Sequence, residues 1–116
     1  MRETQKKGDR AVARAILDFT NSDMDVAIPL TESAAYDLIV DDKGELFRVQ
    51  VRYSTGREVE LRRIHSNSSG YVVKKTAPSA YDWLYVMRPN DERYLIKECL
   101  SNRRSITLTD KYLFAS

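Results

Sequence analysis

A carboxylate, an amide and a cation occur in this chain with the spacing that metal-assisted phosphodiester hydrolysis requires. Asp37 precedes a short turn, and Gln50 and Arg52 follow the turn, two positions apart. Side chains two positions apart on an extended strand point to the same face. Hydrolysis of a phosphodiester needs hard oxygen ligands for Mg²⁺ and a group that handles the attacking water. Asp37, Gln50 and the backbone of Val51 offer oxygens, and Arg52 offers the cation.

The elements around these residues predict a β-hairpin that sets Asp37 beside Gln50. Residues 36–41 and 46–53 are predicted to be strands, joined by the turn Asp42-Lys43-Gly44-Glu45, in which glycine can adopt a positive φ. A hairpin closed symmetrically about positions 43 and 44 places position 37 opposite position 50. Alone, an Asp followed by Gln-x-Arg is more typical of a solvated strand face than of a metal site. The surrounding elements must therefore decide between the two interpretations.

The rest of the chain predicts one α/β domain over residues 1–116, with a mixed central β-sheet of five or six strands flanked by helices. The length suits one compact domain and is too short for two. A helix is predicted over 6–19, where Val12, Ala15, Ile16 and Phe19 recur at helical spacing. Further strands are predicted at 26–29, 59–64, 71–74, 83–87 and 94–96, followed by a short helix at 97–102 and an extended segment at 105–108.

The charges are unevenly distributed along the chain. Residues 1–47 carry 6 basic and 10 acidic side chains, whereas residues 48–104 carry 12 basic and 6 acidic ones. An acidic half and a basic half suit a protein that holds cations in one place and phosphates in another, although a solvated surface with chance asymmetry gives the same counts.

Composition excludes several classes of protein. No apolar run approaches the roughly 20 residues of a membrane span. The polar N-terminus, Met1 to Arg10, predicts no signal peptide. The single Cys99 excludes an internal disulfide and indicates a reducing, cytoplasmic environment.

A basic segment after the motif predicts the contacts to double-stranded DNA. Residues 59–75 form a predicted hairpin with the polar tip Asn67-Ser68-Ser69-Gly70. A two-stranded ribbon fits the major groove, where Arg, Asn and Lys contact base edges and phosphates. An ordinary charged surface hairpin is the alternative. The predicted contacts are Arg57, Arg62, Arg63, His65, Ser66, Asn67, Lys74 and Lys75.

Four stretches resemble the small PD-(D/E)XK endonuclease family, including its homing branch, over residues 6–113. They are Lys7-Gly8-Asp9, Tyr36-Asp37-Leu38-Ile39-Val40-Asp41, Arg48-Val49-Gln50-Val51 and Tyr94-Leu95-Ile96. The resemblance implies a restriction-endonuclease-like core and Mg²⁺-dependent cleavage of double-stranded DNA at a specific site, with Mn²⁺ as a substitute ion. It also implies a homo-tetramer, built as a dimer of dimers. Asp37, Gln50 and Arg52 take the catalytic positions, and the glutamine is characteristic of the homing branch.

Three positions depart from the family's pattern. Val12 stands where the family has a helix Glu, Arg52 where it has Lys, and Ala35 where it has Pro. Arginine keeps its proton, so Arg52 cannot act as a base, although it can hold a water or stabilise the transition state. Asp9, three residues before Val12, is a candidate substitute metal ligand, but an acid in a first helical turn also simply complements the helix dipole.

These departures leave several functions open. An active Mg²⁺-dependent endonuclease is the leading hypothesis. The alternatives are a catalytically inactive or weakened DNA-binding relative, a Holliday-junction resolvase with a similar core, and a partner-binding domain that kept only the fold. One domain of this size buries too little surface to specify a long target, so we expect several copies to act together. The single His65 and Cys99 show no arrangement with an acid that would support a catalytic triad.

Overall fold

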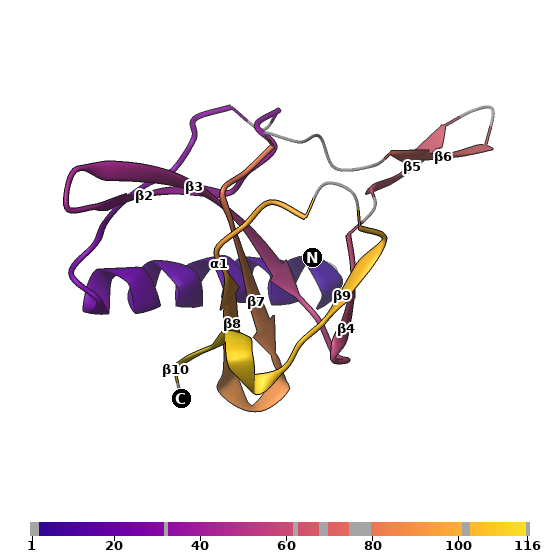
Figure 1. The fold of residues 1–116 in the computed structure, drawn as a ribbon. Coiled ribbons are helices and arrows are strands. Elements are labelled where there is room, and N and C mark those ends of the chain that lie inside the picture. The colour runs from indigo at the N-terminus through magenta and orange to yellow at the C-terminus, as the bar shows by residue number, and fades with distance from the viewer. Residues whose placement is uncertain are drawn as a thin grey trace.

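One long helix lies against one face of a mixed six-stranded sheet (Figure 1). The computed structural model describes residues 3–31, 33–61, 63–67, 70–74, 80–100 and 103–115, and for 3–5, 63–67, 70–74 and 115 it describes the backbone only. The α/β class and the mixed central sheet predicted from the sequence are confirmed.

The sheet has the order β1-β2-β3-β7-β8-β10. β3 and β7 pair in parallel, whereas the other neighbours pair antiparallel. Two small strand pairs lie outside it, β4 with β9 and β5 with β6. The elements are α1 (Glu3–Asn21), β1 (Asp25–Ala27), β2 (Leu38–Asp42), β3 (Glu45–Tyr53), β4 (Glu58–Glu60), β5 (Arg63–Asn67), β6 (Gly70–Lys74), β7 (Trp83–Arg88), η1 (Pro89–Asp91), β8 (Glu92–Ile96), β9 (Ser105–Thr107), η2 (Asp110–Tyr112) and β10 (Leu113–Ala115).

The β2–β3 hairpin has the predicted register. Its pairs run from Leu38 opposite Val49 to Asp42 opposite Glu45. Asp37 lies just outside this ladder, and its N–H donates to the carbonyl of Val49. Lys43 and Gly44 have φ values of 55° and 92°, and the Gly44 N–H donates to Asp41 Oδ1 at 2.8 Å. The turn accepts this geometry because glycine has no Cβ to oppose a positive φ.

Alternating side chains of the sheet pack into two cores, one on each face. The first core lies beneath α1 and contains Ala11, Ala15, Phe19, Leu38, Val40, Val49, Trp83, Tyr85, Met87 and Leu95. The second core lies on the opposite face and contains Val59, Leu61, Tyr81, Leu84, Val86, Tyr94, Ile96, Leu100, Ile106 and Leu108. Because successive residues of a strand face opposite sides, Trp83 and Leu84 belong to different cores.

A buried ionic cluster joins α1 to the sheet beside the first core. Asp18 is 6% exposed and Arg93 is 4% exposed. The Arg93 Nε donates to Asp18 Oδ2 at 2.8 Å, and the Tyr85 hydroxyl donates to the same oxygen at 2.5 Å. Burial, followed by this hydrogen bond, raises the pKa of Tyr85, so the phenol keeps the proton that it donates. We call these three residues the Asp18 cluster.

The helix predicted over residues 97–102 is wrong for 97–100, and residues 101 and 102 lie outside the described part. The chain after β8 is irregular there. The Leu100 N–H donates to the Tyr81 hydroxyl at 3.3 Å, and Leu100 packs into the second core. Lys97 Nζ lies 5.0 Å from the centre of the Trp83 ring. These tertiary contacts replace the i→i−4 hydrogen bonds that a helix would need.

The hairpin predicted over residues 59–75 is shorter and differently paired. β4 pairs with β9, with Val59 opposite Ile106, and both side chains are buried in the second core. The hairpin itself is β5 with β6, from Arg63 opposite Lys74 to Asn67 opposite Gly70. Figure 1 shows it extending away from the sheet. Burial of Val59 therefore fixes β4 to the body of the domain and separates it from the hairpin.

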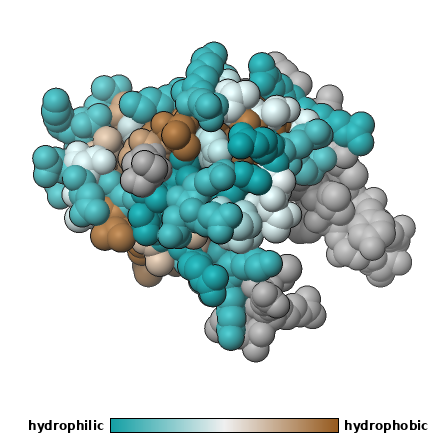
Figure 2. Space-filling view, turned by 90° about the horizontal axis from the view of Figure 1, so that it is seen from below, coloured by the Kyte–Doolittle hydropathy of each residue, from teal (hydrophilic) through white to brown (hydrophobic). Residues whose placement is uncertain are grey.

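The described surface is largely polar. Figure 2 shows hydrophilic side chains over most of the face seen from below, with small, separated hydrophobic areas. The exposed large hydrophobic residues are Leu17, Ile28, Leu30, Leu46 and Leu113. No helix in the described part of the chain is long and apolar enough to cross a membrane.

Candidate active site

Asp37 lies one residue before β2 and is bonded to β3 through both its backbone and its side chain. Its N–H donates to the Val49 carbonyl at 2.8 Å. Its Oδ2 accepts the Val51 N–H, also at 2.8 Å. The N–H and C=O of a strand residue point toward the same neighbour, so the Val51 carbonyl is directed to the side where Asp37 lies. The carboxylate and this carbonyl can thus face one ion.

Gln50 and Arg52 lie on the face of β3 opposite α1. Val49 belongs to the first core and Val51 packs against it, so the residues that alternate with them face the other way. Gln50 pairs with Leu84 of β7, and Arg52 pairs with Val86. Both are half-buried at the margin of the second core. The arrangement sets Asp37, Gln50 and Arg52 around one end of the β2–β3 pair.

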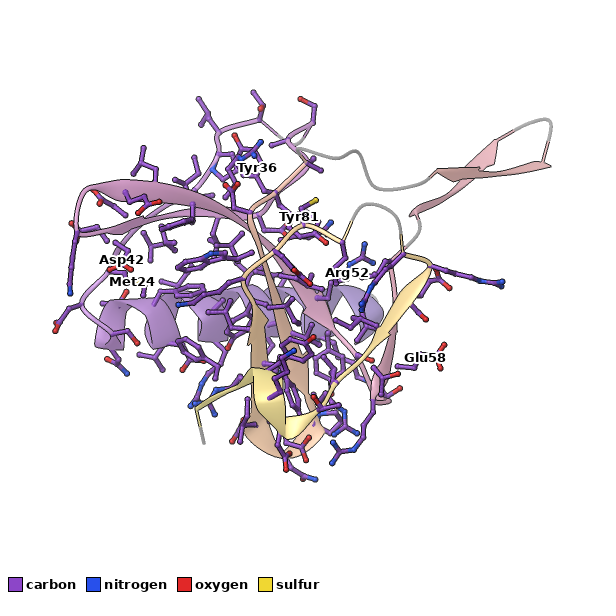
Figure 3. All side chains as sticks on the ribbon, viewed as in Figure 1. Met24, Tyr36, Asp42, Arg52, Glu58 and Tyr81 are labelled. Carbon is purple, nitrogen blue, oxygen red and sulfur yellow. The ribbon has the colours of Figure 1, made fainter. Side chains whose placement is uncertain are left out.

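Tyr81 borders this end of the sheet. Its side chain is buried in the second core, and Figure 3 shows it close to Arg52. Burial raises the pKa of the Tyr81 phenol, whereas the Arg52 charge lowers it to a lesser extent. The phenol therefore stays protonated at neutral pH and cannot serve as a base there.

A second acidic group borders the same strand. Asp82 precedes β7, and its carboxylate accepts the Arg48 Nε at 3.1 Å and the Arg48 Nη2 at 3.3 Å. The Arg48 guanidinium carbon lies 6.0 Å from the centre of the Tyr36 ring. The hydrogen bond from Arg48 lowers the pKa of Asp82, and the same bond raises the pKa of Arg48. The Asp82 carboxylate is thus ionised at neutral pH.

The residues around Asp37 suit a divalent cation. Within the described part of the chain, the Asp37 carboxylate has no ion-pair partner, and the Gln50 amide has no hydrogen bond. A carboxylate, an amide oxygen and a backbone carbonyl are hard ligands of the kind that Mg²⁺ binds. The described residues contain no group of three His, Cys, Asp or Glu side chains that could hold a metal. A ligand set made of Asp37, Gln50 and the Val51 carbonyl would have a single negative charge.

Val12 does not complete this set. It is half-buried and packs against the first core. Lys7 Nζ lies 5.6 Å from the centre of the Tyr53 ring, so the first half of α1 runs along the end of β3 that carries Arg52. Asp9 lies in this half of the helix but is exposed. Val12 therefore adds no oxygen ligand to those around Asp37.

The predicted DNA contacts are only partly described. Arg63, His65, Ser66, Asn67 and Lys74 lie on the β5–β6 hairpin, whose backbone alone is described, and Arg62 and Lys75 lie outside the described residues. Arg57 lies elsewhere. It lines a cavity of about 300 Å³ with residues of the β7–β8 turn, Asn90 and Asp91 among them. That turn is at the end of β7 away from the Leu84 that pairs with Gln50.

A helix lies on one face of a mixed sheet, Asp37 lies just before one strand, and Gln-x-Arg lies on the next. This is the arrangement of a restriction-endonuclease-like domain. The model of the PD-(D/E)XK endonuclease family matches residues 2–111. The chain therefore belongs to the PD-(D/E)XK endonuclease family.

One solved structure gives a more particular likeness. It is that of a bacterial homing endonuclease, I-Ssp6803I, which matches 95% of this chain and 82% of its own length, with 27% sequence identity and a TM-score of 0.80. No match among curated proteins was found.

Sequence reasoning missed two groups of residues that the fold brings together. Asp82 gave little signal, because its partner Arg48 is 34 residues away and the parallel pairing of β3 with β7 is not a local feature. The Asp18 cluster did leave a signal. Asp18 follows Ala15 by three positions, on the apolar stripe of the helix, where a charge requires a buried partner.

Proposed function

We propose that this protein is a divalent-metal-dependent DNA endonuclease that cuts double-stranded DNA at a specific site, with Mg²⁺ as the natural ion and Mn²⁺ as a substitute. The observation that carries this proposal is the Asp37 carboxylate, hydrogen-bonded to the Val51 N–H at 2.8 Å beside the Gln50 face of β3. Membership of an endonuclease family and the likeness to a homing endonuclease support DNA as the substrate. Such an enzyme would act inside the cell, where its substrate is.

The chain's own residues have separate roles in this proposal. Asp37, the Gln50 amide oxygen and the Val51 carbonyl would hold the cation. When bound there, Mg²⁺ supplies Lewis-acid chemistry toward a phosphodiester. Arg52 would hold the attacking water or stabilise the negative charge that develops on the phosphate. It keeps its own proton, so the proton of the water must leave to solvent or to the phosphate.

The second candidate function is that of a DNA-binding relative with weak or no cleavage. Two observations favour it. Val12 packs against the first core where a family member would place a carboxylate. Arg52 stands where the family has a lysine, and the pKa of a lysine, unlike that of an arginine, can be lowered far enough for it to lose its proton. Removal of one ligand charge weakens binding of a divalent cation, and loss of a group that changes protonation slows proton transfer.

One experiment separates these two functions. The parent protein and the double variant Val12→Glu/Arg52→Lys are incubated with a plasmid library that carries random inserts, in Mg²⁺, in Mn²⁺ or in chelator. We expect slow, metal-dependent linearisation by the parent. The double variant should cleave faster by about one to two orders of magnitude, because it regains a carboxylate and a smaller cation. Sequencing of the new ends reports the site.

The matched control is Ala13→Glu/Arg52→Lys, which adds the same charge on the exposed side of the same helix turn. It should cleave no faster than Arg52→Lys alone. If the Val12→Glu/Arg52→Lys variant cuts and the parent does not, the parent is a DNA-binding relative without cleavage activity. If neither protein cuts, although both fold and bind duplex DNA, the nuclease proposal fails.

We propose further that the β5–β6 hairpin contacts DNA and that several copies, as a dimer of dimers, occupy one target. The hairpin extends away from the sheet (Figure 1), and residues 48–104 carry 12 basic and 6 acidic side chains. Each lost phosphate contact should reduce the slope of log affinity against log salt by about 0.9. Lys74→Ala with Lys75→Ala should therefore flatten that slope equally for all sequences, as measured by fluorescence anisotropy.

The control for this prediction is Lys43→Ala with Lys111→Ala, the same change of charge at two exposed sites away from the hairpin. Arg63→Ala or Asn67→Ala should instead relax discrimination at particular base pairs. Sedimentation of the complex should show more than one copy on a duplex. A strict monomer on DNA, or an affinity that does not depend on salt, would refute the picture.

A further inference from the structure

Two aspartates hold strand β3 from its two edges, and one of them is outside the D…Q-x-R pattern. On the β2 side, Asp37 donates its N–H to the Val49 carbonyl and accepts the Val51 N–H, each at 2.8 Å. On the β7 side, Asp82 donates its N–H to the Arg48 carbonyl and accepts the Arg48 N–H through Oδ2, each at 2.8 Å. The segment of β3 that carries Gln50 is thus fixed on both sides by a carboxylate and a backbone N–H.

The two carboxylates differ in their charged neighbours. Asp82 Oδ2 accepts the Arg48 Nε at 3.1 Å, and its Oδ1 accepts the Arg48 Nη2 at 3.3 Å. The Tyr36 ring lies under the same guanidinium, 6.0 Å from its carbon, and Figure 3 shows Tyr36 at the upper end of the sheet. Asp37 has no ion-pair partner among the described residues. Asp82 thus has a structural charge partner, whereas Asp37 is open to a ligand.

The Arg48 charge lies close to the cation site. Arg48 is two residues before Gln50 on the same face of β3. It is also next to Val49, whose carbonyl accepts the Asp37 N–H at 2.8 Å. Arg48 is therefore a near neighbour of Asp37, at the separation of about 7–8 Å that is typical of neighbouring side chains on adjacent strands. At that distance its positive charge opposes a divalent cation held by Asp37, unless a negative charge beside it cancels the field.

We propose that Asp82 is a positioning residue of the cation site. Its backbone and carboxylate hold Arg48, and with it the Gln50 segment of β3, in register with β7. Its negative charge offsets that of Arg48, so that the field at Asp37 still favours a divalent cation. The inference rests on the proposed function, because it takes Asp37 and Gln50 as ligands of that cation.

The test measures Mn²⁺ binding directly, by electron paramagnetic resonance of the free ion at low salt, with no DNA present. In Asp82→Asn an amide oxygen can still accept the Arg48 N–H, but the negative charge is gone. We expect the dissociation constant for Mn²⁺ to rise about five- to tenfold. The double variant Asp82→Asn/Arg48→Met also removes the positive charge, and its dissociation constant should return to within about twofold of the parent value. Cleavage lost in Asp82→Asn should be largely recovered at higher Mn²⁺.

Glu92→Gln is the matched control, because it neutralises the carboxylate of an Arg88–Glu92 pair at the other end of β7. It should leave Mn²⁺ binding unchanged. A lowered melting temperature in Asp82→Asn without weaker Mn²⁺ binding would overturn the inference, as would a double variant that binds no better than the single one. If the parent binds Mn²⁺ through Asp37 but Asp82→Asn binds it equally well, the inference alone fails. A parent that binds no Mn²⁺ overturns the proposed function, and the inference with it.

Discussion

Asp37→Asn is expected to lower metal-dependent DNA cleavage by roughly three orders of magnitude and to leave most DNA binding intact. Asp37 supplies the only negative charge of the proposed ligand set, since Gln50 and the Val51 carbonyl are neutral. An amide binds Mg²⁺ poorly. It does not repel phosphate, so the affinity for duplex DNA should stay the same or increase slightly.

This substitution separates chemistry from folding because the asparagine keeps an oxygen in place. That oxygen can still accept the Val51 N–H, and the backbone bond from residue 37 to the Val49 carbonyl is unaffected. The melting temperature without metal should therefore change little. Asp41→Asn is the matched control, since Asp41 lies on β2 of the same hairpin and its Oδ1 likewise accepts a backbone N–H, that of Gly44, at 2.8 Å. The control should cleave like the parent.

Cleavage rates of Asp37→Asn are best compared with the parent at several Mg²⁺ and Mn²⁺ concentrations. If the rate recovers fully at high metal, Asp37 contributes only affinity for the ion. If it stays low, the carboxylate also orients the ion toward the phosphate. Parent-like cleavage at low metal would show that the cation is held elsewhere, and the assignment of Asp37 would be abandoned.

The features that the sequence predicted correctly in this chain are local. The β2–β3 hairpin needs only alternating side chains and a turn in which Gly44 can take a φ of 92°, so its register follows from contacts over few residues. The helix is likewise set by Ala15, Phe19 and their helical neighbours. As a result, the register of the hairpin, which brings Asp37 beside β3, could be predicted from the sequence alone.

The features that could not be predicted depend on pairing between distant parts of the chain. β3 pairs in parallel with β7, and β4 pairs antiparallel with β9. Long segments separate the strands of each pair, and the alternation of polar and apolar residues does not say which residues of two distant strands face each other. The Arg48–Asp82 contact exists only because of the first pairing. The chain after β8 was predicted to be helical, but Leu100 is drawn into the second core by the Tyr81 hydroxyl. Burial competes there with local helix propensity and prevails.

The buried Asp18 cluster leads to the largest expected effect on stability. Asp18 and Arg93 are 6% and 4% exposed, and the Arg93 Nε and Nη2 donate to the two carboxylate oxygens at 2.8 and 3.3 Å. Asp18→Asn leaves the guanidinium buried without a counter-charge, which typically costs about 3–5 kcal/mol. We expect the free energy of unfolding to fall by about 3 kcal/mol, the lower end of this range, because an amide oxygen can still accept a hydrogen bond from Tyr85. Chemical denaturation with two probes would measure it.

Replacement of the whole ion pair should be far less harmful than replacement of one partner. In Asp18→Leu/Arg93→Met no charge of the Asp18–Arg93 pair remains. Arg14, whose Nε lies 3.5 Å from Asp18 Oδ1, also loses its partner, but its side chain is 32% exposed and can turn to solvent. The double variant should therefore be more stable than either single variant, even though it lacks more of the native hydrogen bonds. Glu92→Gln, which disrupts the more exposed Arg88–Glu92 pair, should change the denaturation midpoint little. If the double variant is less stable than both single variants, this expectation is wrong. The hydrogen bonds of the cluster would then stabilise the fold by more than the pairing of its two opposite charges explains.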